Sequence, residues 1–334
     1  MDATSLRKVR NRATPSGASA GAMSIAAMLA IPRADGLFQQ AVLQSGAGHF
    51  ALPAERAERV ADRVLDELQV RTVEDLRLVP VAQLMAAQRG PTFATGIGDA
   101  LAPSIESFLP FGVVVDGDLL TMSPIEAMRS GAARTVPTII GTTADEWNFV
   151  GLHSRTQAPE LLASMATRFF GRDASSVIDH YRQTLSSASP CEVGEIEIHD
   201  TMHTDHKFTV PALQLADALS DRGVPVYLYL FVFRVDGNEL GAIHAAEQVY
   251  VFGNLAPWKS LQTFFANRGV GLRSVHRTVA RAWTGFARSG EPGAFAGQEW
   301  ERWDERKSTA VIDRTNSITR HPLVERIQPW QGRM

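Results

Sequence analysis

Eight consecutive apolar residues, Val-Tyr-Leu-Tyr-Leu-Phe-Val-Phe, occupy positions 226–233. A strand that is apolar on both faces needs helices on both sides, which is typical of a central strand in a parallel sheet. Shorter strands are expected at 41–43, 113–115 and 136–140, with a late edge strand at 309–313. Helical patterns separate these strands, so the sequence predicts an α/β fold with a mostly parallel sheet and flanking helices.

The helical segments show two kinds of pattern. Residues 20–31 are apolar nearly all round, which is typical of a buried helix. Residues 54–68 carry apolar side chains at spacings of three and four, which predicts an amphipathic helix. Ser123 and Pro124 open a further helix that reaches about Arg129, because serine caps a helix and proline suits its first position. We expect other helical stretches at 73–78, 81–88, 158–170, 175–185, 195–220 and 275–288.

Composition narrows the class of protein. The 334 residues are 45% hydrophobic and 21% charged, which is ordinary for a globular chain and argues against disorder. With 33 basic and 36 acidic residues the formal net charge is −3, and no dense basic block suggests nucleic-acid binding. No apolar run is long enough for a transmembrane helix. The single cysteine, Cys191, rules out an internal disulfide and fits a reducing compartment, so we expect a cytoplasmic protein.

A Gly-x-Ser-x-Gly pattern stands at residues 17–21 and carries the sharpest chemical signal. Small residues around Ser19 allow a sharp turn from strand to helix, which exposes the hydroxyl above a helix N-terminus. The backbone N–H of Ala20 would then point at a developing oxyanion. The same five residues also fit an ordinary helix cap, so the pattern needs partners elsewhere in the chain.

Two further residues complete a set in the order serine, acid, histidine. Glu146 follows the strand expected at 136–140, and His244 follows the strand at 226–233. A serine needs a base to remove its proton, and the base needs a carboxylate that orients it. Asp145, beside Glu146, is the alternative acid.

These motifs resemble the type B carboxylesterases, the family of the bacterial para-nitrobenzyl-type esterases and the cholinesterases. The matching stretches run in family order, at residues 17–24, 36–46, 115–118, 141–147, 204–208 with Pro211, 241–247 with 251–253, and 283–292. The resemblance implies an α/β-hydrolase fold, with Ser19 as nucleophile, His244 as general base and then acid, and Glu146 as its orienting carboxylate. It also implies hydrolysis of a small-molecule ester through an acyl-enzyme, without a cofactor or metal.

The sequence departs from the family pattern at two places. Ala18 stands where the family usually has glutamate, so a carboxylate beside the nucleophile is lost. The glycine-rich loop that supplies two further oxyanion donors in the family is not found in residues 1–16. We therefore expect a divergent segment at 1–16 and the C-terminal part of a carboxylesterase domain at 17–334, truncated at its N-terminus. Reduced activity, a catalytically silent binding module, and a homodimer or missing N-terminal partner remain open.

Trp147, Phe252 and Trp258 are candidates for an acyl or alcohol pocket, with core packing as the alternative for each. Glu247 is expected either near the site or in a solvated or salt-bridge role, and Ser45 is interpreted as a turn residue.

His199, His203 and His206 form the main rival constellation. The first two are four residues apart on a predicted helix, a spacing that metal ligands use. The stretch around His203 and His206 matches a structural helix of the esterase family, which favours a packing role and no metal.

Overall fold

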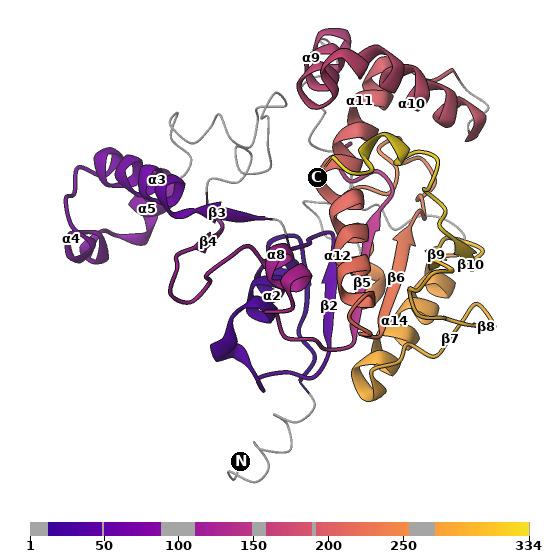
Figure 1. Ribbon diagram of the computed structural model, residues 1–334, viewed down its shortest axis with the longest axis horizontal. Coiled ribbons are helices and arrows are strands. Elements are labelled where there is room, and N and C mark those ends of the chain that lie inside the picture. Colours follow the sequence, from indigo (N-terminus) through magenta and orange to yellow (C-terminus); the bar gives the residue numbers. More distant parts are fainter. Residues whose placement is uncertain are drawn as a thin grey trace.

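The computed structural model describes residues 13–48, 50–87, 111–148, 158–188, 192–253 and 271–333. Within these residues a six-stranded sheet forms the centre of the molecule (Figure 1). The strand order is β1 (Ser16–Ala18), β2 (Ala41–Gln44), β5 (Thr138–Thr143), β6 (Val226–Phe231), β9 (Ser308–Ile312) and β10 (Ser317–Arg320). Each strand in this order pairs in parallel with the next, except that β10 pairs with β9 in the antiparallel direction.

Helices cover both faces of this sheet, as the apolar run at 226–233 predicts. Helices α2 (Ala20–Ala30), α8 (Pro124–Ser130) and α12 (Val210–Ser220) share one apolar core with the sheet. Helix α14 (Leu272–Ser289) packs in a second core on the other face. Leu228 belongs to the first core and Tyr229 to the second, so β6 is buried on both sides. The predicted α/β fold is confirmed.

A third group of helices lies beyond the ends toward which the strand arrows point in Figure 1. Helices α9 (Ala158–Phe170), α10 (Ala174–Ala188) and α11 (Glu195–Thr204) share an apolar cluster with Ile327 and Trp330 from the C-terminal segment. A π-helical turn, η5 (Asp205–Thr209), joins α11 to α12. The single helix predicted over 195–220 is therefore one helical path with a wider turn inserted in it.

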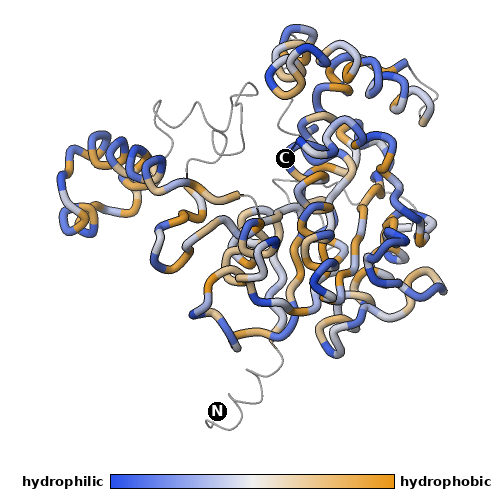
Figure 2. Tube along the Cα trace, viewed as in Figure 1, coloured by the Kyte–Doolittle hydropathy of each residue, from blue (hydrophilic) through white to orange (hydrophobic). Residues whose placement is uncertain are grey.

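A smaller unit projects from the sheet (Figure 1). It contains β3 (Ala51–Pro53), α3 (Ala54–Glu67), α4 (Val73–Leu78), α5 (Val81–Ala87) and β4 (Val113–Val115). Strand β3 pairs in parallel with β4 and was not predicted. Apolar and polar residues alternate along α3 (Figure 2), and no residue of α3 is buried.

The structure confirms one further prediction, for a helix cap, and contradicts another, for an edge strand. The cap of α8 is confirmed, because Ser123 and Glu126 form a reciprocal capping box. The prediction that 309–313 is an edge strand is wrong, because β9 pairs with β6 and β10. Residues 88–110, Cys191, Trp258 and most of the 1–16 segment lie outside the described residues. The remaining short elements are η1 (Pro32–Ala34), η4 (Gly171–Asp173), α13 (Gln248–Val251), β7 (Ala294–Phe295), β8 (Gln298–Glu299) and η6 (Gln328–Trp330).

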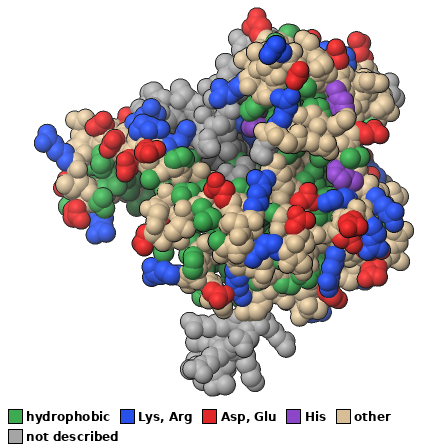
Figure 3. Space-filling view, in the orientation of Figure 1, with side chains coloured by type: hydrophobic (Ala, Val, Ile, Leu, Met, Phe, Trp, Pro, Cys, Tyr) green, Lys and Arg blue, Asp and Glu red, His purple; other side chains and the backbone are tan. Residues whose placement is uncertain are grey.

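Acidic and basic side chains are interspersed on the face shown in Figure 3. None of the helices that the structure describes has both the length and the apolar character to cross a membrane.

Candidate active site

Ser19 lies in the tight turn between β1 and α2. Its φ of 54° is unusual for a residue with a side chain and marks a strained turn. The turn is held by its backbone: Ser19 N–H donates to the Gln44 carbonyl at 2.8 Å, and the Ser19 carbonyl accepts from Met23 N–H at 3.0 Å. The Ser19 side chain makes no capping hydrogen bond. Ser19 thus occupies the N-cap position of α2, as the alternative interpretation expects, but its hydroxyl does not cap the helix.

Glycine at two positions lets the turn pack closely. A Cβ atom on Gly17 would lie 2.6 Å from the Gly21 carbonyl carbon, and one on Gly46 would lie 2.6 Å from the Ser19 carbonyl oxygen. Ala20, the first residue of α2, is exposed. Its N–H belongs to the first helical turn, where backbone donors have no partner within the helix and favour negative charge.

Glu146 follows β5 and is fully buried. Its Oε1 atom accepts a hydrogen bond from Thr143 N–H at 2.8 Å, and its Oε2 atom lies 2.5 Å from His244 Nδ1. A proton on Nδ1 satisfies this contact, which makes Nε2 the proton-accepting nitrogen of the ring. The structure thus brings together the acid and the histidine that the sequence proposed.

Asp145 has a different role from its neighbour. Its Oδ2 atom accepts from Ala242 N–H at 2.7 Å, and its Oδ1 atom pairs with Arg234 at 3.0 Å. Asp145 N–H in turn donates to the Ala242 carbonyl at 3.0 Å. Asp145 therefore fastens the loop after β6 to the loop after β5, and Glu146 is the carboxylate that faces the imidazole.

The surroundings of His244 favour its protonated form. Burial lowers the pKa of His244, but the negative charge of Glu146 and the hydrogen bond to it outweigh burial, so the pKa is raised. The ring of Phe208, from the π-helical turn η5, lies 5.1 Å from the imidazole.

Glu247 lies three residues beyond His244 and is fully buried. Its Oε1 atom accepts hydrogen bonds from Gln44 Nε2 at 3.0 Å and from the Tyr229 hydroxyl at 3.1 Å. Neither partner is a cation and the side chain is buried, so the solvated or salt-bridged alternative is wrong. Glu247 lies near His244 and Glu146, as the other alternative expects. The sequence analysis did not single out Gln44 or Tyr229 as site residues. The signal for Gln44 was its position as a polar residue at the end of an apolar strand.

The three aromatic pocket candidates differ in where the structure places them. Trp147 is 1% exposed and stacks on His203 with ring centroids 4.8 Å apart. Its backbone N–H donates to Thr204 Oγ1 at 3.1 Å. Trp147 therefore packs in the interior, and its expected place in a pocket lining is corrected to the packing role. Phe252 is 72% exposed, and Trp258 lies outside the described residues.

The histidines of the rival constellation each contact another ring. His203 packs on Trp147, and the ring centroid of His206 lies 4.1 Å from that of Phe169. The ring centroid of His199 lies 4.5 Å from that of His203, and His199 Nδ1 lies 2.9 Å from Asp200 Oδ1. Burial lowers the pKa of His206 to about 3 and also lowers that of His203. Within the described ranges, no three histidine, cysteine, aspartate or glutamate side chains come together as a metal-binding set.

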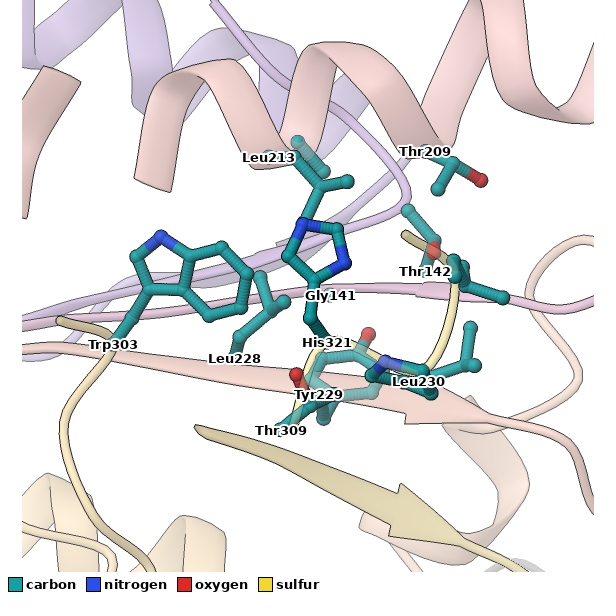
Figure 4. Close-up of a pocket in the computed structure, with 13 residues that line it drawn as sticks. Gly141, Thr142, Thr209, Leu213, Leu228, Tyr229, Leu230, Trp303, Thr309 and His321 are labelled. Atoms are coloured by element: carbon teal, nitrogen blue, oxygen red, sulfur yellow. The ribbon is translucent and has the colours of Figure 1, made fainter. Parts of the chain in front are cut away.

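A small cavity lies between α12 and strands β5, β6 and β9 (Figure 4). Figure 4 shows the His321 ring projecting from the C-terminal segment between Trp303 and Thr142. The cavity volume is about 20 Å³, room for about one water molecule. It is too small for an ester substrate.

A mostly parallel sheet with a strained serine turn after one strand, an acid after a second and a histidine after a third defines the α/β-hydrolase fold. A model of the "Carboxylesterase family" matches residues 10–330. The chain belongs to the carboxylesterase family. The match begins within the 1–16 segment that we set apart as divergent.

Comparisons with individual proteins support the same family. The chain is 31% identical to the para-nitrobenzyl esterase of Bacillus subtilis (strain 168), over 93% of this chain and 60% of that protein. It is 25% identical to the mouse (Mus musculus) pyrethroid hydrolase Ces2a, over 96% of this chain and 57% of that protein. The structure of Geobacillus stearothermophilus carboxylesterase EST55 matches with a TM-score of 0.76 and 29% identity, covering 98% of this chain and 67% of that one. The chain spans about 60% of the length of these curated relatives.

Proposed function

We propose that this chain hydrolyses carboxylic esters of small molecules through a covalent acyl-enzyme. The observation that carries the proposal is the 2.5 Å contact between Glu146 Oε2 and His244 Nδ1, at the end of the sheet where the Ser19 turn also lies. The names of the relatives, an esterase and a pyrethroid hydrolase among them, support the reaction class.

In the first half of the proposed reaction, Ser19 Oγ attacks the ester carbonyl carbon and its proton passes to His244 Nε2. The carbonyl oxygen becomes an oxyanion, which the Ala20 N–H stabilises. Collapse of this intermediate breaks the bond to the alcohol, which leaves with the proton from His244. Glu146 stabilises the imidazolium cation while it exists.

In the second half, water takes the place of the alcohol. His244 removes a proton from the water, which attacks the acyl carbon, and the bond to Ser19 Oγ breaks as the serine recovers its proton. The products are a carboxylic acid and free enzyme. No metal or cofactor enters either half of this proposal.

The oxyanion environment sets the expected rate. Ala20 supplies one N–H donor, and removal of a single oxyanion donor costs about 2.7–4 kcal/mol of transition-state stabilisation in related chemistry. We therefore propose that hydrolysis is slow when the Ala20 N–H acts alone, and that a second copy of this chain in a homodimer raises the rate by supplying further donors.

A catalytically silent binding module is the second candidate function. The observation that favours it is that, in the part of the chain that the structure describes, the Ala20 N–H is the one oxyanion donor that we assign. The Ser19, Glu146 and His244 set would turn over very slowly without further donors. This candidate predicts a folded protein that does not react at Ser19.

A fluorophosphonate probe and a short-chain para-nitrophenyl ester separate the two candidates. We expect labelling and hydrolysis by the wild-type chain, and loss of both in Ser19→Ala and His244→Ala. Ser24→Ala is the matched control, since Ser24 is exposed on α2 and bonds the Ala20 carbonyl at 2.8 Å. Equal labelling of wild type and Ser19→Ala would reject Ser19 as nucleophile. A folded wild type that is not labelled would favour the binding module.

A further inference from the structure

Gln44 occupies a junction between the segments that carry the candidate active-site groups. It ends β2, where it lies opposite Ala18 of β1 on one side and Gly141 of β5 on the other. It is 1% exposed. Its backbone carbonyl accepts the Ser19 N–H, while its side-chain amide donates to Glu247 Oε1 at 3.0 Å. One residue therefore contacts both the serine turn and the histidine loop.

The side-chain oxygen of Gln44 is also engaged. Ser16 Oγ, at the start of β1, donates to Gln44 Oε1 at 3.3 Å. The amide group is thus held from the β1 side and directed at Glu247, which fixes its orientation. A hydrophobic side chain of the same length would fill the space without making either bond.

Glu247 is the second member of this junction. Its Oε2 atom is buried and has no hydrogen-bond partner among the described residues. Its backbone carbonyl accepts from Tyr250 N–H at 2.9 Å and begins the short helix α13. Since a buried carboxyl group with one oxygen unpaired is costly, a purely structural role would be served better by a neutral side chain. The carboxyl group at this position points to an electrostatic effect on its neighbours.

Tyr229 completes the junction because Gly141 leaves room for it. A Cβ atom on Gly141 would overlap the Tyr229 ring. The ring lies against Trp283 of α14, with centroids 5.2 Å apart, and its hydroxyl reaches Glu247. Two neutral donors from two strands therefore hold the same carboxylate oxygen.

We propose that Gln44 is a positioning residue of the candidate active site, which couples the serine turn to the histidine loop through the buried carboxyl group of Glu247. The proposal rests on the esterase function proposed above. Gln44 touches no substrate atom in this scheme, and its effect reaches His244 only through Glu247.

The charges of the buried groups determine in which direction the coupling shifts the pKa of His244. Burial and the nearby charge of Glu146 raise the pKa of Glu247, and the hydrogen bond from Gln44 opposes that rise. The charge of Glu247 in turn helps Glu146 to raise the pKa of His244. Among the described residues, the titratable groups that act on Glu247 and His244 are Glu146, these two residues themselves and Tyr229.

Loss of the Gln44 amide has a defined consequence. Glu247 without that hydrogen bond keeps its proton to higher pH, so less negative charge faces His244. The pKa of His244 then falls. Removal of the Glu247 charge also lowers the pKa of His244, without the step through Gln44. The Gln44 and Glu247 substitutions therefore act on His244 through the same charge.

The experiment compares Gln44→Met, Glu247→Gln and the double variant with wild type. The readouts are the titration of the His244 imidazole by NMR and the pH dependence of kcat/KM for a para-nitrophenyl ester. We expect each single variant to titrate His244 at lower pH and to lower kcat by about tenfold, as a lost hydrogen bond to a charged group does. We expect the double variant to show no further shift.

Gln40→Met is the matched control. Gln40 accepts a hydrogen bond from Thr14 Oγ1 at 2.6 Å and lies four residues before Gln44, outside the contacts of Glu247. We expect the control to leave the His244 titration unchanged. Tyr229→Phe, which keeps the ring over Gly141 and removes only the hydroxyl donor, shifts the titration in the same direction and replaces Gln44→Met if that variant does not fold.

Two results would overturn the proposal: a His244 titration in Gln44→Met that matches the control, or shifts that add in the double variant. An inactive wild-type chain contradicts the esterase function and not the coupling, because the NMR titration does not require turnover.

Discussion

Glu146 and His244, 98 positions apart in the chain, meet through Oε2 and Nδ1 at 2.5 Å. Glu146 is fully buried, so the imidazole faces a carboxylate shielded from water. The contact orients the ring and raises the pKa of His244 against the opposing effect of burial.

Glu146→Gln removes the charge and keeps the shape of the side chain. We expect kcat for a para-nitrophenyl ester to fall by roughly three to four orders of magnitude, because the imidazolium loses its counter-charge and the favoured tautomer is no longer enforced. Steady-state kinetics and the rate of fluorophosphonate labelling measure this loss. Glu160→Gln, an exposed change on α9, is the control. A Glu146→Gln enzyme of wild-type rate would remove Glu146 from the mechanism.

Gly141→Ala tests the packing on which the Tyr229 hydroxyl depends. The added Cβ atom would overlap the Tyr229 ring, so the ring must shift from the position in which its hydroxyl bonds Glu247. We expect a loss of about 1–3 kcal/mol in the free energy of unfolding, as overpacking of a core typically causes. Urea denaturation measures this loss. An unfolding midpoint equal to that of wild type would show that the sheet absorbs the methyl group.

Arg326→Met tests the ion pair that joins the C-terminal segment to η5. Arg326 donates to both carboxylate oxygens of the fully buried Asp205, at 3.0 and 2.7 Å. Loss of one partner leaves a buried charge, which costs about 3–5 kcal/mol of stability. We expect Asp205→Asn combined with Arg326→Met to recover part of that loss in urea denaturation. Equal stability of the single and double variants would contradict a buried, uncompensated charge.

His206 makes the fold sensitive to acid. Burial, followed by the charges of Lys207 and Arg168, lowers its pKa to about 3 from the ordinary value of 6.5. Between these values the unfolded chain binds a proton that the folded chain does not, so stability falls as the pH drops from 6.5 toward 3.

His206→Phe removes this linkage and keeps an aromatic ring against Phe169 and Trp330. We expect wild type to lose more stability than the variant between pH 7.5 and pH 5, measured as the shift of the urea midpoint. A parallel decline of the two proteins would show that His206 is not the group that titrates.

The pattern of side chains predicted most of the fold. The apolar run at 226–233 became β6, and the predicted helices at 73–78 and 158–170 have the same bounds as α4 and α9. Periodicity predicts these elements because the spacing of apolar residues within a segment indicates which of its faces is buried. The strand predicted at 309–313 is present as β9, but its assignment to an edge of the sheet is wrong because β10 pairs with it. Whether a strand is central or at an edge depends on a partner that its own residues do not encode.

The order of Ser19, Glu146 and His244 was likewise visible in the sequence, since each follows a strand and the carboxyl ends of parallel strands meet at one edge. Tertiary structure alone decided what surrounds them. Gln44, Tyr229 and Glu247 are far apart in the chain and come together only because β2, β5 and β6 lie side by side and Gly141 admits the tyrosine ring. Local patterning reports burial and turn geometry, whereas a hydrogen-bond network among buried polar groups depends on distances that only the packed sheet sets.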